Sequence, residues 1–317
     1  NWVKQRYDLV VAKEMINFVP GIVPGIGMAM NCFTQKGDKV MIQPPVYHPF
    51  AWVTTRNERT LVINPLRWEN GMYRMDLDAF REQIKGCKLF ILCNPHNPGG
   101  VVWTEAELRA IADICYDEKV LVFSDEIHAD LTLPPHTHRP FATVSEKARM
   151  NSVTFMSPSK AFNMPGLSAS HALIFNEDLR KRFRIYMDAG ELDMGHVFAF
   201  LSVEAAYSHG TEWLDQCLAY IQGNIDFVDE FLKKHAPKIK AIRPEASYLV
   251  WLDCRELELS QKDLNEFFVD KAHLALNDGE MFGKEGIGFM RLNVASPRCI
   301  IEKAMKQLAD AYQLYIK

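Results

Sequence analysis

Short apolar runs that alternate with amphipathic stretches constrain the fold of this chain more than any other feature. Strand-like runs stand at 39–42, 60–63, 89–92, 120–123, 153–156 and 172–175, and helix-like stretches at 49–56, 77–84 and 105–118 separate several of them. Short apolar strands that alternate with helices are typical of a mostly parallel sheet covered on both faces. The sequence therefore predicts an α/β fold whose functional residues lie just past the carboxyl ends of the strands.

The pattern changes in the second half of the chain. Residues 178–235 are predicted to be helical almost throughout, and strand-like runs return at 239–242, 248–252 and 289–293 before a closing helix at 300–315. The chain has 317 residues, which is enough for two domains. We therefore predict a large domain over 1–210 and a smaller α+β domain over 211–317.

Composition excludes several classes of function. The formal net charge of -4 gives no electrostatic basis for binding nucleic acid or an anionic membrane, and no apolar run approaches the length that spans a bilayer. The seven cysteines are scattered without a CxxC pair, so neither a zinc site nor a disulfide framework is indicated. We expect a cytoplasmic protein with reduced thiols and no metal centre.

A lysine stands where a strand is predicted to end. The segment 157–160 (Ser-Pro-Ser-Lys) follows the apolar run 153–156. The amine of Lys160 could condense with the aldehyde of a cofactor while the hydroxyls of Ser157 and Ser159 bind its phosphate. The alternative is an ordinary polar loop. Upstream, the Pro-Gly segment 20–25 precedes helical residues, so it predicts either a phosphate site at a helix start or a plain turn.

Two further strand ends carry polar residues that an ordinary loop would not require. Prolines around Asn97 fix the backbone and leave its amide free to donate into a cleft. Asp125 follows the run 120–123, and a carboxylate buried there must be paired, for which a protonated ring nitrogen is the natural partner. A helix cap or a structural ion pair is the other interpretation of Asp125.

An aromatic residue and an arginine complete the set. Tyr47 follows two prolines after the strand-like run 39–42, where its ring could cover a flat heterocycle or could simply belong to the core. Arg291 lies inside the apolar run 289–293 and requires an anion, either a substrate carboxylate or a local acidic side chain. Together these residues form the set that pyridoxal-phosphate enzymes need.

The chain resembles fold-type I pyridoxal-phosphate enzymes, and within them the MalY/PatB-like cystathionine β-lyase (C–S lyase) group of the aminotransferase class I/II family. The similarity runs from Trp2 to the C-terminus. Its motifs are 94–100 (Asn-Pro-His-Asn-Pro-Gly-Gly), 124–128 (Ser-Asp-Glu-Ile-His), 157–163 (Ser-Pro-Ser-Lys-Ala-Phe-Asn), 248–253 (Tyr-Leu-Val-Trp-Leu-Asp) and 288–293 (Gly-Phe-Met-Arg-Leu-Asn) with Pro-Arg at 297–298. The resemblance implies a mostly parallel seven-stranded sheet flanked by helices, with a smaller C-terminal domain.

The resemblance also implies which residues hold the cofactor ring. Lys160 would bond to pyridoxal 5'-phosphate and later remove the Cα proton of the substrate. Asp125 would keep the ring nitrogen protonated, and Tyr47 would stack on the ring. Asn97 and His128 would hydrogen-bond its phenolic oxygen.

Phosphate and carboxylate sites follow from the same resemblance. The phosphate would lie against Ser157, Ser159 and the backbone N–H groups of Ile22 and Val23, and Arg291 with Asn97 would hold the substrate α-carboxylate. Two departures stand out. Ser168 occupies the position of a phosphate-binding arginine in classical aminotransferases, which favours the lyase group. The first several dozen residues of the family have no counterpart here, so we expect either a fragment or a missing segment.

The implied activity is β-elimination on a sulfur-containing L-amino acid such as cystathionine, which yields a thiol, pyruvate and ammonia. An aminotransferase would use the same residues, and a cofactor-binding regulatory protein is a second alternative. The resemblance further implies a homodimer with shared active sites. The polar segment 188–195 lies between two predicted helices and could cross to the partner subunit or form a solvated loop.

Overall fold

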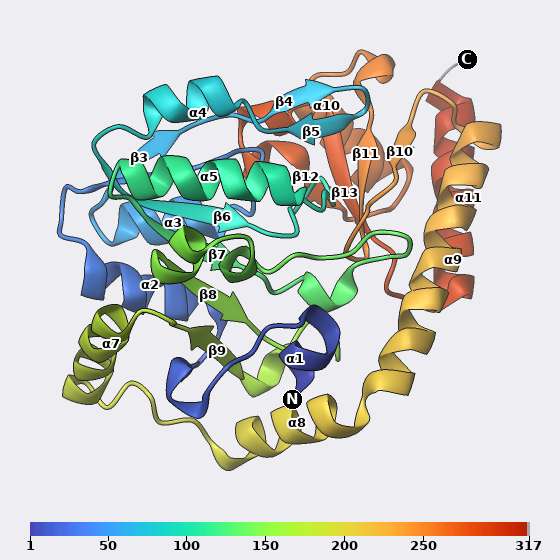
Figure 1. Cartoon of the computed structure of the whole chain (residues 1–317). Coiled ribbons are helices and arrows are strands. Elements are labelled where there is room, and N and C mark those ends of the chain that lie inside the picture. The colour runs from blue at the N-terminus through green and yellow to red at the C-terminus, as the bar shows by residue number, and fades with distance from the viewer. Residues whose placement is uncertain (316–317) are drawn as a thin grey trace.

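The computed structural model describes residues 1–315, and within them the largest sheet has seven strands (Figure 1). In spatial order these strands are β1 (Ile16–Val19), β9 (Ser170–Leu173), β8 (Ser152–Met156), β7 (Leu121–Asp125), β6 (Cys87–Cys93), β2 (Lys39–Ile42) and β3 (Thr60–Ile63). Strands β8, β7, β6, β2 and β3 are parallel, whereas β9 is antiparallel to both of its neighbours. The mostly parallel sheet predicted from the sequence is confirmed.

Helices cover both faces of this sheet, as the apolar strands require. On β6, Leu89 and Ile91 face a core shared with α2 (Ile22–Phe33), α3 (Pro49–Arg56) and α7 (Glu177–Ala189). Phe90 and Leu92 face the opposite core, which also contains side chains from the helices on the other side of the sheet, α4 (Leu77–Gln83), α5 (Glu105–Asp117) and α6 (Glu146–Met150). Because alternate residues of a strand point to opposite faces, a strand between two helical layers is apolar at nearly every position.

The start of α2 differs from the sequence prediction, which placed helical character only from Ile26 onward. The helix begins at Ile22, inside the Pro-Gly segment, with Gly21 as its N-cap at φ 123°. A proline in the first turn of a helix loses no hydrogen bond, so Pro24 is compatible with this earlier start. The first N–H groups of α2 therefore belong to Ile22 and Val23.

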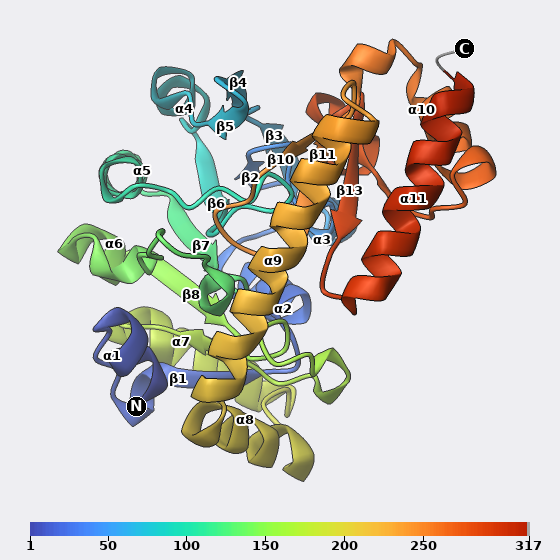
Figure 2. The ribbon, with the colours of Figure 1, turned by 90° about the vertical axis from the view of Figure 1, so that its right-hand side faces the viewer.

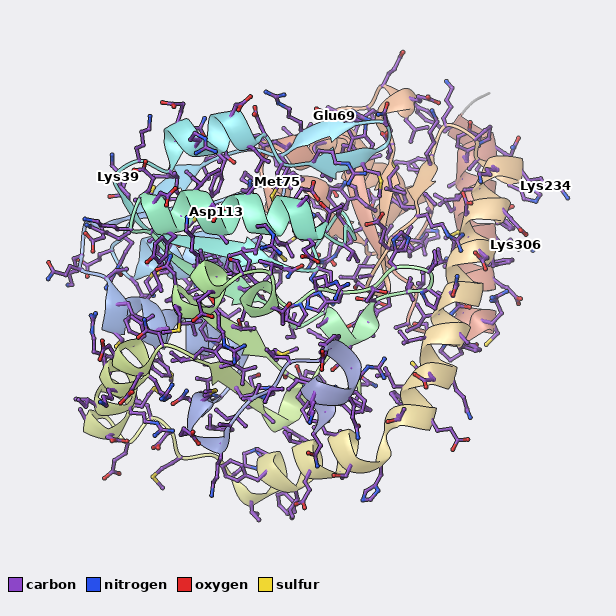
Figure 3. All side chains as sticks on the ribbon, in the orientation of Figure 1. Lys39, Glu69, Met75, Asp113, Lys234 and Lys306 are labelled. Atoms are coloured by element: carbon purple, nitrogen blue, oxygen red, sulfur yellow. The ribbon has the colours of Figure 1, made fainter. Side chains whose placement is uncertain are left out.

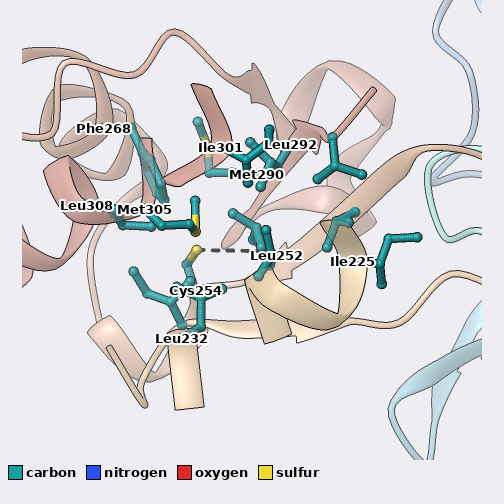
Figure 4. Close-up of a cluster of buried hydrophobic side chains, with 14 of the residues drawn as sticks. Ile225, Leu232, Leu252, Cys254, Phe268, Met290, Leu292, Ile301, Met305 and Leu308 are labelled. Carbon is teal, nitrogen blue, oxygen red and sulfur yellow. Dashed lines mark hydrogen bonds between the residues drawn. The ribbon is translucent and has the colours of Figure 1, made fainter. Parts of the chain in front are cut away.

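A second sheet lies in the C-terminal part of the chain. Within the described residues it has four antiparallel strands, in the order β10 (Lys240–Ile242), β11 (Leu249–Asp253), β13 (Phe289–Asn293) and β12 (Asn277–Asp278). The helices α9 (Thr211–His235) and α11 (Arg298–Tyr315) pack on it through an apolar cluster that includes Leu232, Leu252 and Met305 (Figure 4). Figure 2 shows that α9 extends from α8 (Val197–His209) to this sheet. A domain boundary at 210/211, where α9 begins, stays a prediction.

Several short elements were not predicted. The hairpin β4 (Arg67–Glu69) and β5 (Met72–Arg74), the two-residue strand β12 and the short helices α6 and α10 (Gln261–Glu266) carry too few apolar residues to show a period. Helix α1 (Trp2–Tyr7) begins the described chain. Charged residues such as Lys39, Lys234 and Lys306 are exposed (Figure 3). Over residues 1–315 no helix is both long enough and apolar enough to cross a membrane.

One short segment ties the two sheets together. The Gly100 carbonyl accepts hydrogen bonds from the backbone N–H groups of Glu245 (2.8 Å) and Ala246 (3.1 Å). In the same segment, the Ser247 N–H donates to the Leu131 carbonyl at 2.8 Å. The loops that follow β6 and β7 are therefore both bonded to the connection between β10 and β11.

Gly100 is the point of closest approach in this junction, and we expect Gly100→Ala to destabilise the protein. Its φ is +69°, and an added Cβ would lie 2.5 Å from Pro244 Cβ and 2.8 Å from Pro244 Cα. Left-handed strain costs about 1–2 kcal/mol, and overpacking adds about 1–3 kcal/mol. The matched control is Gly86→Ala, where φ is +76° and nothing lies within 4 Å. Urea unfolding should show a larger loss for Gly100→Ala, and equal losses would contradict this packing.

Candidate active site

A cavity of about 440 Å³ lies at the carboxyl ends of the central strands, against the small sheet. It is lined by Ile22, Val23, Pro24, Tyr47, His48, Cys93, Asn97, Asp125, Ile127, His128, Ser159, Lys160, Tyr248, Leu249, Arg291 and Asn293. Every site residue predicted from the sequence is in this set except Ser157. The cavity therefore collects residues that are as far apart in the chain as Ile22 and Asn293.

Asp125 is the last residue of β7 and is 3% exposed. The Ile127 N–H donates to its Oδ1 at 3.1 Å. The pKa of Asp125 is raised to about 7, mainly by burial; the Ile127 N–H and Lys160 act to lower it, and the neighbouring Glu126 acts to raise it. A cationic group bound in the cavity would stabilise the charged form of this carboxyl. A protonated ring nitrogen satisfies that need.

Lys160 and His128 face the same cavity from neighbouring turns. Lys160 lies in the turn that follows β8, and His128 lies three residues after Asp125. Burial, with smaller effects of the charges of Lys160 and Arg291, lowers the pKa of His128 to about 3. Its imidazole is therefore neutral, and among residues 1–315 its Nδ1 has no hydrogen-bond partner. A neutral imidazole can still donate one N–H, as a phenolic oxygen of a bound ring requires.

The start of α2 and the Ser157–Ser159 pair form a polar cup. Gly21 provides no side-chain cap, so the N–H groups of Ile22 and Val23 have no partner within the helix. Ser157 does not line the cavity; its Oγ donates to the Ala169 carbonyl at 2.7 Å and lies 2.9 Å from Ser159 Oγ. Ser157 therefore supports Ser159, and the cup of two N–H groups and a hydroxyl suits a phosphate.

Arg291 is held by amides and not by an acidic side chain. Its Nη1 donates to Asn97 Oδ1 at 2.8 Å and its Nη2 to Asn277 Oδ1 at 2.7 Å, while Nε has no partner. Its guanidinium lies over the Phe282 ring at 4.6 Å. Burial lowers its pKa to about 10, so it stays charged at neutral pH. Among residues 1–315 no acidic side chain forms an ion pair with it, which leaves room for a substrate carboxylate.

Tyr47 satisfies both of the interpretations considered for it. It packs edge-to-face on Phe50, with ring centroids 5.8 Å apart, and it also lines the cavity.

Sequence reasoning missed other lining residues, among them His48, Cys93, Tyr248 and Asn293. His48 and Cys93 could have been found from their positions, directly after Tyr47 and directly after the predicted strand 89–92. Tyr248 and Asn293 lie in two of the motifs that carry the family resemblance, which was the signal for them.

A lysine, a buried carboxylate, an anion cup and a free arginine at strand ends define a site that fits pyridoxal phosphate. The model of the family described as aminotransferase class I and II matches residues 1–308. The chain belongs to this family.

Individual relatives agree with this assignment. The chain is 38% identical to "Cystathionine beta-lyase PatB" of Bacillus subtilis, over 98% of this chain and 81% of the relative. It is 29% identical to "Protein MalY" of Escherichia coli, over 98% and 80%. Among solved structures, pyridoxal-phosphate-containing cystalysin from Treponema denticola has a TM-score of 0.97 at 34% identity, over 100% of this chain and 80% of that one. The C–S lyase of Staphylococcus hominis, bound to the same cofactor, has a TM-score of 0.91 at 33% identity, over 98% and 80%. The predicted fold type is thereby confirmed.

The environment of Asp125 predicts opposite effects of Asp125→Asn on stability and on turnover. The pKa of Asp125 in the folded protein is raised above its ordinary value of about 3.8, so its stability contribution is complete below about pH 3.8 and is lost as pH rises to about 7. At pH 8 the cofactor-free variant should therefore be at least as stable as wild type. The cofactor-loaded variant should lose kcat by at least about 100-fold, because the ring nitrogen would lack its anionic partner.

Thermal unfolding of the cofactor-free proteins and steady-state kinetics of the loaded ones test this pair of effects. Asp253→Asn is the matched control, since Asp253 is paired with Arg255 and has a lowered pKa. It should lose stability at pH 8 and keep its kcat. A loaded Asp125→Asn protein within about threefold of wild-type kcat would show that Asp125 has a different role.

Proposed function

We propose that this protein is a pyridoxal-phosphate-dependent C–S lyase. It would carry out β-elimination on a sulfur-containing L-amino acid such as cystathionine and yield a thiol, pyruvate and ammonia. The observation that carries the proposal is that Lys160, Asp125 and the Asn97–Arg291 pair share one cavity. The names of relatives such as PatB and the Staphylococcus hominis enzyme favour a lyase.

The residues of the cavity divide the work between binding and proton transfer. When bound, pyridoxal phosphate would supply an aldehyde that bonds to amines and a ring that accepts electron density. Arg291, held by Asn97, would fix the substrate carboxylate and so orient the Cα–H bond toward Lys160. The Lys160 amine would take the Cα proton, and the C–S bond would break with its electron pair going to sulfur.

Other residues would hold the cofactor and tune its charge. Asp125 would keep a proton on the ring nitrogen, because a cationic partner offsets the free-energy cost of burying the negative charge of Asp125. His128 and Asn97 would donate to the phenolic oxygen, and Tyr47 would cover the ring. The phosphate would lie against Ser159 and the Ile22 and Val23 N–H groups. After the thiol has left, water would hydrolyse the bond between Cα and nitrogen, which gives pyruvate and ammonia.

An aminotransferase is the second candidate, because the family includes such enzymes and the same residues would serve. Ser168 argues against an aminotransferase, because the family resemblance places it where classical aminotransferases have a phosphate-binding arginine. A regulatory protein that binds the cofactor and acts through partners is the third possibility. The cytoplasmic location expected from the sequence stays a prediction.

The proposal predicts pyruvate formation that depends on Lys160. Purified protein loaded with cofactor should release pyruvate from L-cystathionine without added keto acid, and Lys160→Ala should abolish the release. Borohydride should fix the cofactor on Lys160, as mass spectrometry of the peptide would show. Amino transfer to a keto acid without pyruvate release would favour the aminotransferase. Cofactor binding with neither reaction would favour the regulatory protein.

We also propose that the protein is a homodimer with shared active sites. Helix α8 supports this, because its side chains are apolar around most of its circumference and several are solvent-exposed: Val197 (61%), Phe198 (67%), Phe200 (50%) and Leu201 (54%). A helix that is apolar all round is normally buried. The segment 190–196 directly precedes α8 and follows α7. A second copy would cover this surface, since two-fold assemblies are the commonest oligomers.

Mixing two inactive proteins tests whether the site is shared. Lys160→Ala and a variant altered within 188–195 should each be inactive. After unfolding and refolding together, mixed dimers should regain up to about one native site in two. Each variant refolded alone is the control. An active monomer would overturn the shared site, whereas inactive mixed dimers would overturn only the role of the 188–195 segment.

A further inference from the structure

A fully buried hydrogen-bond network lies next to Asp125 in the turn after β7. Glu126 and His138 both have fully buried side chains, and His138 Nε2 lies 2.8 Å from Glu126 Oε2. Glu126 Oε1 accepts from Ser124 Oγ and from the Phe141 N–H, each at 2.8 Å. Both carboxylate oxygens are thus occupied by donors from two segments, so the carboxylate is held in a single orientation.

This network braces the turns that carry the site residues. Phe141 and His138 bond to Glu126, which lies between Asp125 and His128 in the turn after β7. From the same segment, the Arg139 carbonyl accepts from Asn94 Nδ2 at 3.1 Å in the turn after β6, which carries Asn97. Segment 138–141 therefore bonds to both strand-end turns. Neither Glu126 nor His138 lines the cavity, so neither would touch the cofactor or substrate.

We propose that Glu126 and His138 are positioning residues that hold Asp125 in the cavity and set its charge, a role that rests on the proposed function of Asp125 as partner of a ring nitrogen. A carboxylate one residue away repels a second negative charge in a medium that water does not reach. His138 Nε2, 2.8 Å from Oε2, and the Phe141 N–H hold the Glu126 carboxylate against segment 138–141 and outside the cavity lining.

Other charged or titratable groups lie near the pair and near Asp125. Tyr7 of α1 meets the His138 ring edge-on, with centroids 5.4 Å apart. Asp130 accepts from Tyr7 and from Trp2 Nε1 and lies near Arg6, so its charge is already matched by donors of α1. On the cavity side Lys160 lowers the pKa of Asp125, whereas Glu126 raises it. Of these groups, Glu126 is the nearest to Asp125 in the chain, and its like charge raises the pKa of Asp125.

Titration of Asp125 in the cofactor-free protein tests the proposal. The infrared band of the protonated Asp125 carboxyl is identified by its loss in Asp125→Asn. The intensity of this band as a function of pH gives the titration midpoint of Asp125. Glu126→Gln should lower that midpoint by on the order of one pH unit, because a like charge is removed while Ser124, Phe141 and His138 can still bond to the new amide. Asp253→Asn should leave it unchanged. A folded Glu126→Gln protein with the wild-type midpoint would overturn the proposal.

A second comparison addresses position separately from charge. His138→Gln retains an N–H donor to Glu126, so the loaded enzyme should keep kcat within about threefold. His138→Leu removes the donor and leaves a buried carboxylate underpaired, so kcat should fall at least tenfold while KM changes little. Equal kcat for His138→Leu and wild type would contradict the positioning role, and if His138→Leu does not fold, the Glu126→Gln titration decides alone. Since that titration uses no substrate, its failure would leave the proposed function untouched.

Discussion

The buried carboxyl of Asp125 is the constraint on which the rest of this site depends. At the end of β7 it has one backbone donor and, among residues 1–315, no cationic partner in direct contact, and its pKa is raised to about 7. Glu126, immediately beside it, has protein partners on both carboxylate oxygens, namely Ser124, Phe141 and His138. One strand end thus carries two carboxyls with opposite environments, of which one is closed by protein donors and the other opens to a ligand.

The position of Arg291 follows the same principle from the other side of the cavity. It belongs to the small sheet, yet one of its two amide partners, Asn97, comes from the large sheet. A guanidinium that bonds to neutral amides keeps its full charge for a ligand, whereas an ion pair would neutralise it. Because the 245–247 segment bonds to the loops after both β6 and β7, the relative placement of Arg291 and Asp125 is set by backbone hydrogen bonds as well as by side chains.

Surface and interior have different functions in this chain. The apolar residues of β6 are explained by the two helical layers that cover it, and those of α9 by the small sheet. The apolar residues of α8 have no such explanation within one chain, since Phe198 and Leu201 are more than half exposed. A second copy of the chain would cover this surface in the proposed homodimer.

The sequence by itself determined the alternation of strands and helices, and hence the parallel sheet and the edge at which function gathers. It also singled out Lys160, Asp125, Asn97 and Arg291, because each is a polar residue at a position where a strand demands an apolar one or ends. Only the tertiary structure decided what each side chain meets. Sequence could not separate a salt bridge from an amide clamp for Arg291, since Asn97 and Asn277 are 194 and 14 positions away. It could not place Ser157 behind Ser159, nor start α2 at Ile22, because those depend on side-chain direction and on a left-handed Gly21. The order of apolar and polar residues within a short stretch determines which of its positions are buried. Contacts between residues far apart in the chain depend on how the elements pack, and no short stretch of sequence contains that information.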